Sequence, residues 1–381
     1  MLEKYIREIG ECSRCGICRH WGWNGVSDVC PVYAYTEQYE TQYPRGRVKL
    51  AKELVEGNIE PSSLMAEHVL ECTLCGRCEE LCPVDLPLHD ILHALRTDIY
   101  AKGFTIPTHE RIRKILLDHL NPYGPDRKKK DKPSDPRIGA QVLYYPGCST
   151  VRKTSSEIAQ VESILKALGV DYDIFWDDTC CGLPLHDTGM IEEMKTVAGK
   201  TRELIEKRKP AVVLTTCPGC QKAIEKLWKD VCGFETGFEV QGIEVFLGER
   251  LDLQEHPKGG RKVTWHDACE LGRGMGVYEL PRDIIRSLPG YELVEMREHH
   301  EKSACCGAGG GVMAGFKTAT RGMGRDRINQ AIEAGAEAII TSCPACYMNF
   351  SAALKKDDKL KVRFLSELVE ESVAEGNSAE E

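Results

Sequence analysis

Cysteines occur twice in the same unusual pattern between residues 148 and 346. In each copy a single Cys is followed by a Cys-Cys-Gly triplet and then by a Cys-x-x-Cys pair. The second copy follows the first at offsets of 121 residues (148 to 269), 125 residues (180 to 305) and 126 residues (217 to 343). The two sets are Cys148, Cys180, Cys181, Cys217 and Cys220, and Cys269, Cys305, Cys306, Cys343 and Cys346. Five thiols at a nearly constant register indicate a duplicated unit that carries a metal or redox site.

Two further cysteine runs precede the duplication. Residues 72–83 follow the spacing C-x2-C-x2-C-x3-C-P, which is typical of a loop that wraps a [4Fe–4S] cubane and sends its last Cys to a second cluster. The earlier run has the same start, but eleven residues rather than three separate Cys18 from the final Cys30-Pro31. We interpret the extra residues as a loop insertion. Cys30 would still bind the cluster that is held mainly by the other run.

Each cubane is therefore predicted to take three ligands from one run and one from the other. The first set is Cys12, Cys15, Cys18 and Cys82, and the second is Cys72, Cys75, Cys78 and Cys30. A pair of zinc knuckles is the alternative, although zinc sites seldom place Pro directly after the last of four such cysteines.

The length and composition limit the classes of protein to which the chain can belong. The chain of 381 residues is long enough for two to three domains. Its net charge of −9 argues against a nucleic-acid-binding surface. Nineteen cysteines fit either a disulfide-rich secreted protein or a cytosolic metalloprotein. Residues 1–30 contain no apolar signal segment and no stretch approaches about 18 apolar residues, so we expect a cytoplasmic protein with metal-bound thiolates.

The periodicity of apolar residues changes along the chain. Helices are predicted at 48–55, from 61 to 70 and at 104–120, followed by an exposed linker at 122–139. The basic run 126–133 in this linker could instead dock an acidic partner. From residue 140 strands alternate with helices, which indicates two Rossmann-like α/β halves with parallel sheets.

In these halves the cysteines come directly after strands. Strands are predicted at 141–145, 173–176, 211–215, 262–265 and 337–341, and helices at 154–168 and 190–207. Open α/β sheets place their sites at the carboxyl ends of strands, so two pseudo-symmetric halves would bring the two cysteine sets face to face. The expected domains are 1–121 (α-helical), 122–139 (linker), 140–258 and 259–368 (α/β), and 369–381, an acidic, disordered tail.

Three resemblances follow from these motifs. The eight cysteines and two prolines of about residues 1–100 resemble the α-helical dicluster ferredoxin domain of the succinate dehydrogenase iron–sulfur subunit. The ten later cysteines resemble the CCG domain family, and both together resemble the D-type catalytic subunits of heterodisulfide reductase. The resemblance implies two cubane [4Fe–4S] clusters and, in each CCG copy, a noncubane [4Fe–4S] cluster held by all five thiolates. Gly182 and Gly307 would let backbone N–H groups approach sulfur.

Neither CCG copy lacks a Cys, which favours two functional clusters over a zinc site or a dithiol/disulfide pair in one copy. A disulfide needs two electrons, and two facing clusters would supply one each. The ten CCG cysteines are thus the predicted catalytic residues of an oxidoreductase that reduces, or reversibly forms, a small-molecule disulfide such as the coenzyme M–coenzyme B heterodisulfide. One alternative is an electron-transfer subunit of a quinone- or flavin-linked complex, and another is a zinc-bound interaction module.

A partner must supply the electrons, because no dinucleotide-binding fingerprint is evident. A membrane cytochrome b or a flavoprotein would serve, and the chain would then lie at the inner face of the cell membrane through that subunit.

Several single residues are weaker candidates. His186 and the pair His266-Asp267 could donate protons to product thiols, unless they only hydrogen-bond their own loops. The glycine-rich stretch 307–311 lacks the Lys of a P-loop, which favours tight backbone packing around the second cluster. Three basic residues near the cysteines could meet an anionic substrate, and one Cys outside both patterns is expected to be a buried apolar residue. These are Arg152, Lys153 and Arg273, and Cys232.

Overall fold

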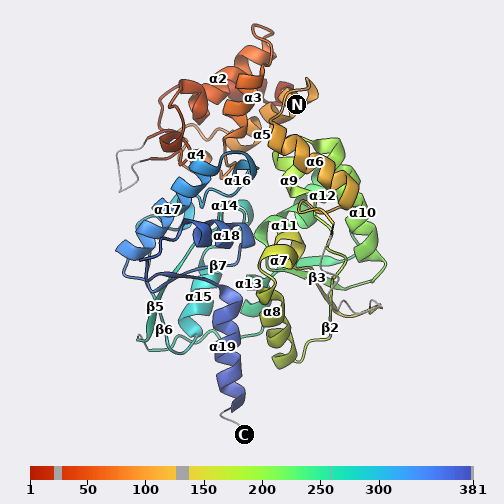
Figure 1. Cartoon of the computed structure of the whole chain (residues 1–381), viewed down its shortest axis with the longest axis vertical. Helices are drawn as coiled ribbons and strands as arrows, with labels where there is room; N and C mark the ends of the chain where they lie inside the picture. Colours follow the sequence, from red (N-terminus) through yellow and green to blue (C-terminus); the bar gives the residue numbers. More distant parts are fainter. Residues whose placement is uncertain (21–27, 126–136, 258, 379–381) are drawn as a thin grey trace.

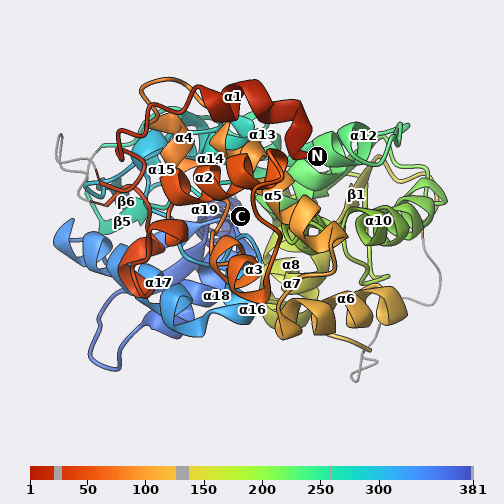
Figure 2. The ribbon, with the colours of Figure 1, turned by 90° about the horizontal axis from the view of Figure 1, so that it is seen from above.

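The computed structural model describes residues 1–20, 28–125, 137–257 and 259–378, with side chains up to residue 373 in the last helix. An α-helical domain lies at one end of the molecule, and two α/β units lie side by side beneath it (Figure 1). Figure 2 looks down on the helical domain and shows it across the boundary between the two units. The predicted fold class, an α-helical domain followed by two Rossmann-like α/β units, is confirmed. Within the described residues, no helix is both long and apolar enough to cross a membrane.

The helical domain is built from short helices around two cysteine-bearing loops. Its elements are η1 (Leu2–Tyr5), α1 (Ile6–Gly10), η2 (Tyr33–Tyr35), η3 (Glu40–Gln42), α2 (Pro44–Val55), α3 (Ser63–Leu70), α4 (Arg77–Glu80), α5 (Leu88–Ala101) and α6 (Pro107–His119). Local sequence sets the helix starts: α2 and α6 begin with Pro, and the Ser62 side chain caps α3 by accepting a hydrogen bond from the Met65 amide at 3.2 Å. The two helices expected between the cysteine runs are α2 and α3.

The first α/β unit contains one four-stranded sheet. Its elements are β1 (Val142–Tyr144), α7 (Gly147–Lys153), α8 (Ser156–Ala167), β2 (Tyr172–Ile174), α9 (Leu183–Asp187), α10 (Ile191–Glu206), β3 (Val212–Thr215), α11 (Pro218–Lys222), the π-helical turn η4 (Ala223–Leu227), α12 (Trp228–Asp230), β4 (Glu239–Gly242) and α13 (Ile243–Gly248). All neighbouring strands are parallel, in the order β2-β1-β3-β4.

The second unit repeats this plan. Its elements are β5 (Arg261–Trp265), α14 (Gly272–Met275), α15 (Glu279–Ser287), β6 (Tyr291–Leu293), η5 (His300–Lys302), α16 (Val312–Gly315), α17 (Lys317–Glu333), β7 (Ala338–Thr341), α18 (Pro344–Ala353), β8 (Lys361–Phe364) and α19 (Leu365–Ser378). The parallel order β6-β5-β7-β8 matches that of the first unit strand for strand. The repeat in the sequence is therefore a repeat of the fold.

The C-terminal helix differs from the expected disordered tail. Helix α19 continues to Ser378, and its residues Leu365, Leu368 and Val369 are fully buried. They belong to one apolar core that contains residues of both units, such as Val142 and Trp265. Figure 1 shows α19 alongside α8 of the first unit. Apolar residues among the glutamates give α19 a buried face, so the chain gains hydrophobic stabilisation there instead of remaining unfolded.

Candidate metal centre

The eight cysteines of the helical domain line two separate cavities of similar size. The first is lined by Cys12, Cys15, Cys18 and Cys82, and the second by Cys30, Cys72, Cys75 and Cys78. Each cavity thus has three cysteines from one run and the last cysteine of the other. This grouping matches the ligand sets expected from the spacing. Residues 21–27, which form most of the insertion before Cys30, lie outside the described residues.

The two cysteine loops share an unusual backbone conformation. Two and four residues after Cys12, and again after Cys72, the backbone is left-handed, with φ of 57° at Arg14, 81° at Gly16, 51° at Leu74 and 74° at Gly76. Such residues turn the chain sharply, so that three successive thiols converge on one point. The Leu74 amide also donates to the Cys72 sulfur at 3.4 Å.

Six of the ten CCG cysteines come after the central strands, and the other four, Cys180, Cys181, Cys305 and Cys306, come after the edge strands β2 and β6. Cys148 and Cys269 follow β1 and β5, and the Cys-x-x-Cys pairs follow β3 and β7. The first residue of each Cys-x-x-Cys pair is held in the same way, because the amides of Cys217 and Cys343 each donate to a threonine hydroxyl at 3.2 Å.

In each copy the five sulfurs form a chain of neighbours in the same order. The order is Cys148, Cys180, Cys181, Cys220, Cys217 in the first copy and Cys269, Cys305, Cys306, Cys346, Cys343 in the second. Hydrogen bonds from its two sulfur neighbours lower the pKa of the middle residue, Cys181 or Cys306, well below its usual range.

Glycines bring backbone close to these sulfurs. Gly182 and Gly307 have φ of 93° and 90°, and their amides donate to the sulfurs of Cys180 and Cys305 at 3.4 and 3.3 Å. The carbonyl group before each glycine is anchored by a side chain that the sequence did not single out. Trp228 Nε1 donates to the Cys181 carbonyl at 2.9 Å, and Asn349 Nδ2 donates to that of Cys306 at 2.5 Å.

The segments beside the two CCG sites contact each other at the boundary between the units. Lys222, two residues after Cys220, forms a 2.9 Å ion pair with Glu270, the residue after Cys269. Nearby, Lys226 Nζ donates to the Gly274 carbonyl at 3.0 Å. The segments that follow Cys220 and Cys269 therefore contact each other, and the face-to-face arrangement of the two cysteine sets stays a prediction.

The helical domain is locked onto both units by Arg96. This fully buried guanidinium donates to the carbonyls of Asp187 (2.6 Å) and Gly310 (2.9 Å), one in each α/β unit. It also donates to Val69 and Cys72 of its own domain.

The glycine-rich stretch of the second unit packs against the second ferredoxin loop. A Cβ atom on Gly310 would lie 2.5 Å from the Cys72 carbonyl oxygen, and one on Gly309 would lie 2.8 Å from that of Thr73. The sulfur of Cys75 interacts with that of Cys305, so a predicted cubane ligand adjoins a predicted CCG ligand. The stretch thus provides tight backbone packing, here between domains.

Most of the weaker candidates are bound within the protein. Arg152 pairs with Asp178 at 2.5 Å, Lys153 lies 5.0 Å from the centre of the Tyr123 ring, and Arg273 donates to the Cys75 carbonyl at 2.6 Å. His186 stacks on His93 of the helical domain, with ring centres 3.9 Å apart. Its Nδ1 lies 3.2 Å from the Asp187 carboxylate.

The structure also shows the surroundings of Asp267 and Cys232, two further residues that the sequence singled out. Asp267 makes a buried two-pronged ion pair with Arg282 at 2.7 and 2.9 Å. Cys232, expected to be buried, is partly exposed and packs at the rim of the first unit's core. The basic run 126–133 lies outside the described residues.

His266 is different, because one of its ring nitrogens faces cysteine sulfur. This nitrogen and the sulfurs of Cys306 and Cys346 all lie within 4.8 Å of one another. The imidazole is 1% exposed, and burial lowers its pKa.

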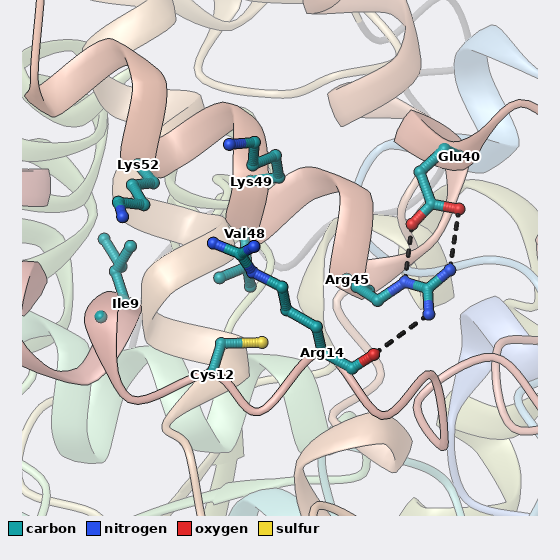
Figure 3. A pocket seen from close by; sticks show the side chains of 9 residues that line it. Ile9, Cys12, Arg14, Glu40, Arg45, Val48, Lys49 and Lys52 are labelled. Atoms are coloured by element: carbon teal, nitrogen blue, oxygen red, sulfur yellow. Dashed lines mark hydrogen bonds and ion pairs between the residues drawn. The ribbon is translucent and has the colours of Figure 1, made fainter.

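A basic cavity adjoins the first ferredoxin site (Figure 3). It is lined by Cys12, Arg14, Arg45, Lys49 and Lys52 together with Ile9, Gly10, Glu40 and Val48. Figure 3 shows the lysines projecting from α2 and the Arg14 side chain extending towards that helix. Arg45 pairs with Glu40 at 2.6 Å and donates to the Arg14 carbonyl at 3.1 Å.

The donor set of these sites fits iron–sulfur clusters. Burial raises the pKa of Cys18 to about 12 and that of Cys30 to about 11, so these thiols become thiolates only when a metal replaces the proton. Groups of four and five thiols, with backbone N–H groups directed at sulfur, are the environment in which proteins hold such clusters.

Family models match both parts of the chain. A 4Fe-4S dicluster domain matches residues 8–86, and the cysteine-rich domain CCG matches residues 142–225 and 263–351. A structure of a hypothetical protein from Helicobacter pylori, 10% identical, covers 86% of this chain and 66% of that chain with a TM-score of 0.57, which shows a shared fold alone.

Curated relatives match over most of their length. The chain is 30% identical over 398 residues to the D subunit of dihydromethanophenazine:CoB–CoM heterodisulfide reductase from Methanosarcina barkeri, covering 97% of this chain and 95% of that protein. It is 27% identical to the B subunit of fumarate reductase (CoM/CoB) from Methanothermobacter marburgensis, over 90% of this chain and 69% of that protein. It is 26% identical to the glycolate oxidase iron–sulfur subunit of Escherichia coli, over 95% of this chain and 93% of that protein.

Proposed function

Because the chain belongs to the family of CCG-domain iron–sulfur proteins that includes the D subunit of heterodisulfide reductase, we propose that it reduces, or in reverse forms, a small-molecule disulfide. The chain is an iron–sulfur redox subunit of the oxidoreductase class. The coenzyme M–coenzyme B heterodisulfide is the proposed type of substrate, because the name of the relative from Methanosarcina barkeri specifies it.

The observation that carries the proposal is that each α/β unit has a complete set of five cysteines and that the segments beside these sets are joined across the boundary between the units. The ion pair between Lys222 and Glu270 joins the segments that follow Cys220 and Cys269. A disulfide at this boundary would have one sulfur towards each site. A subunit that only relays electrons has no need of two complete five-cysteine sites.

The proposed cofactors follow the cysteine groups. The two cavities of the helical domain would hold one cubane [4Fe–4S] cluster each, and each set of five CCG cysteines would hold one noncubane [4Fe–4S] cluster. When bound, these clusters supply electrons one at a time. About 16 iron atoms per chain are then expected, whereas a zinc site or a dithiol pair in one copy would lower that number.

The reaction balances with an external electron donor. Breaking one S–S bond takes up two electrons and two protons and releases two thiols. The chain's own residues hold the cysteine sulfurs in place, because Gly182 and Gly307 direct amide N–H groups at Cys180 and Cys305. Buried anchors such as Trp228 and Asn349 fix the backbone on either side of the boundary.

The electron donor is proposed to be a membrane cytochrome b or a flavoprotein subunit that docks at the first ferredoxin site. Cys15 is exposed there, and the adjoining cavity is rich in basic side chains. In this proposal the chain lies in the cytoplasm, at the inner face of the membrane through that partner. The alternative is an electron-transfer subunit of a quinone- or flavin-linked complex, which the similarity to the glycolate oxidase iron–sulfur subunit supports.

EPR of the anaerobically purified, oxidised protein tests the proposal. The spectrum is recorded with and without the coenzyme M–coenzyme B heterodisulfide and coenzyme M, alongside iron and zinc analysis. A new paramagnetic signal on addition is the expected result, because substrate sulfur would perturb a CCG site. An unchanged spectrum at full iron content would favour the electron-transfer alternative instead.

A further inference from the structure

The two CCG copies differ at one position that faces the sulfurs. Tyr145 and His266 each lie three residues before the first cysteine of their copy and directly after the first strand of their unit. Their backbones are equivalent, since the Tyr145 amide donates to Leu214 of β3 at 2.7 Å and the His266 amide donates to Ile340 of β7 at 2.8 Å. Their side chains have different partners.

In the first copy the polar group at this position is bound to a backbone carbonyl. The Tyr145 hydroxyl donates to the carbonyl oxygen of Thr179 at 2.6 Å. The hydroxyl has one proton to donate, and this contact uses it.

In the second copy a buried arginine fixes the tautomer of the histidine. Arg327 Nε donates to His266 Nδ1 at 3.1 Å. A guanidinium has donors only, so Nδ1 must be the acceptor and the proton of the neutral imidazole must lie on Nε2. Arg327 is itself fully buried and held by the Glu298 carbonyl (2.6 Å) and Gln330 Oε1 (2.7 Å).

Two cysteine sulfurs lie close to the His266 ring. Among the described residues, His266 Nε2 is a buried polar atom with no hydrogen-bond partner. The nearby sulfurs are those of Cys306 and Cys346. Phe350 packs edge-on against the imidazole, with ring centres 4.8 Å apart, and keeps the ring in this orientation.

We infer that His266 is a positioning residue that donates an Nε2–H···S hydrogen bond to the Cys306 thiolate, and that this bond gives the second CCG centre a higher reduction potential than the first. Hydrogen bonds to ligand sulfur stabilise the more negative, reduced state of a cluster. The second centre is also the one whose Cys305 adjoins Cys75 of the ferredoxin domain. It is therefore the centre that receives the first electron. The inference rests on the proposed function, because it requires a cluster in each copy.

The test compares three variants in EPR-monitored redox titrations of iron-loaded protein. His266→Phe keeps a planar ring beside Phe350 but removes the donor. It should lower the reduction equilibrium constant of one CCG centre about tenfold, which is about 59 mV for a one-electron couple. His266→Gln keeps an N–H group near the Nε2 position and should stay within about twofold of the wild type, since it replaces the hydrogen bond. Tyr145→Phe is the matched control in the first copy and should leave both potentials unchanged.

A second measurement uses the wild-type chain, so its main readout does not depend on how a variant folds. Protein labelled with 15N only in histidine should show a histidine nitrogen coupling in the pulsed EPR spectrum of one CCG centre, and His266→Gln should remove it. Two CCG signals without any such coupling would overturn the inference and leave the proposed function intact. Equal shifts of both centres in His266→Phe would also overturn it. Absence of CCG signals from the wild type would overturn both.

Discussion

The ammonium group of Lys222 lies 2.9 Å from the carboxylate of Glu270, and this ion pair joins the two copies of the CCG unit next to their cysteines. Both side chains are largely buried, at 13% and 17% exposure. Although burial lowers the pKa of Lys222, the charges of Glu270 and Asp187 raise it above its ordinary value. The pair is thus a charged, largely buried contact between the two α/β units.

Replacing one residue of this pair should lower the stability of the protein more than replacing both. Lys222→Met leaves the Glu270 carboxylate without its cation, which should lower the free energy of unfolding by about 3 kcal/mol. The double variant with Glu270→Gln should regain most of that loss. Anaerobic urea unfolding of the iron-loaded proteins measures both values, and additive losses would contradict the prediction.

Replacing one cysteine should remove one complete cluster. Cys30→Ala should lower the iron content by about 4 atoms per chain, because four thiolates hold each cubane, and one cubane EPR signal should disappear. Cys232→Ala is the matched control, since Cys232 lines neither cavity of the helical domain and belongs to neither CCG set. An unchanged iron content in Cys30→Ala would show that the assignment of Cys30 as a cubane ligand is wrong.

Arg96 should be necessary for holding the three parts of the chain together. Arg96→Met preserves the length of the side chain but removes donors to carbonyls in the helical domain and in both α/β units. Buried carbonyls left without partners cost about 1–3 kcal/mol each. Limited proteolysis should therefore cleave the variant faster near the ends of α5 and α6. Arg111→Met on the exposed surface of α6 is the control, and equal cleavage rates in the two variants would contradict the role.

Stability should fall between pH 4.5 and about 8 because of Glu157. Burial raises the pKa of this carboxyl to about 8 from an ordinary value of 4.5, while the Thr150 hydroxyl donates to it at 3.1 Å. In this window the unfolded chain has released a proton that the folded chain retains, so rising pH favours unfolding.

Glu157→Gln removes that proton linkage. At pH 8 it should be more stable than the wild type by on the order of 3 kcal/mol, and at pH 5 it should be nearly equal. Urea unfolding at both pH values, with the exposed-site variant Glu60→Gln as control, measures the difference. The same pH dependence in Glu157→Gln and in the wild type would exclude this residue as its source.

The charge of the side chains at the first ferredoxin site should affect the rate at which a donor protein reduces the chain. Arg14→Glu reverses a basic side chain beside Cys12, and it should slow reduction by an acidic donor protein about tenfold at low salt, since opposite charges speed association. The effect should decline as salt is added. Lys359→Glu, at the other end of the molecule, is the control. Stopped-flow reduction measures the rates, and equal rates for both variants would place the docking site elsewhere.

The sequence predicted the cysteine groups well, because ligand spacing and the position of cysteines after strands are local properties. It did not identify β4 or β8, which are polar edge strands without an apolar run. It also missed the buried face of α19, because scattered glutamates dominate the composition there.

The interdomain residues could not be predicted in the same way. Arg96 lies on an ordinary amphipathic helix, and its partners are carbonyls 91 and 214 residues away. His266 is recognisable as a candidate from its place before Cys269, but its orientation depends on Arg327, 61 residues later in the chain. Contacts of this kind depend on tertiary packing, which no local pattern encodes.

The contact of Gly310 with the Cys72 carbonyl also has a consequence for the speed of turnover. A backbone-to-backbone contact without room for a Cβ atom keeps the ferredoxin loop and the second CCG unit in one rigid arrangement. Electrons would then cross this boundary without any swinging movement of a carrier domain. Internal electron transfer should accordingly be insensitive to the viscosity of the solvent.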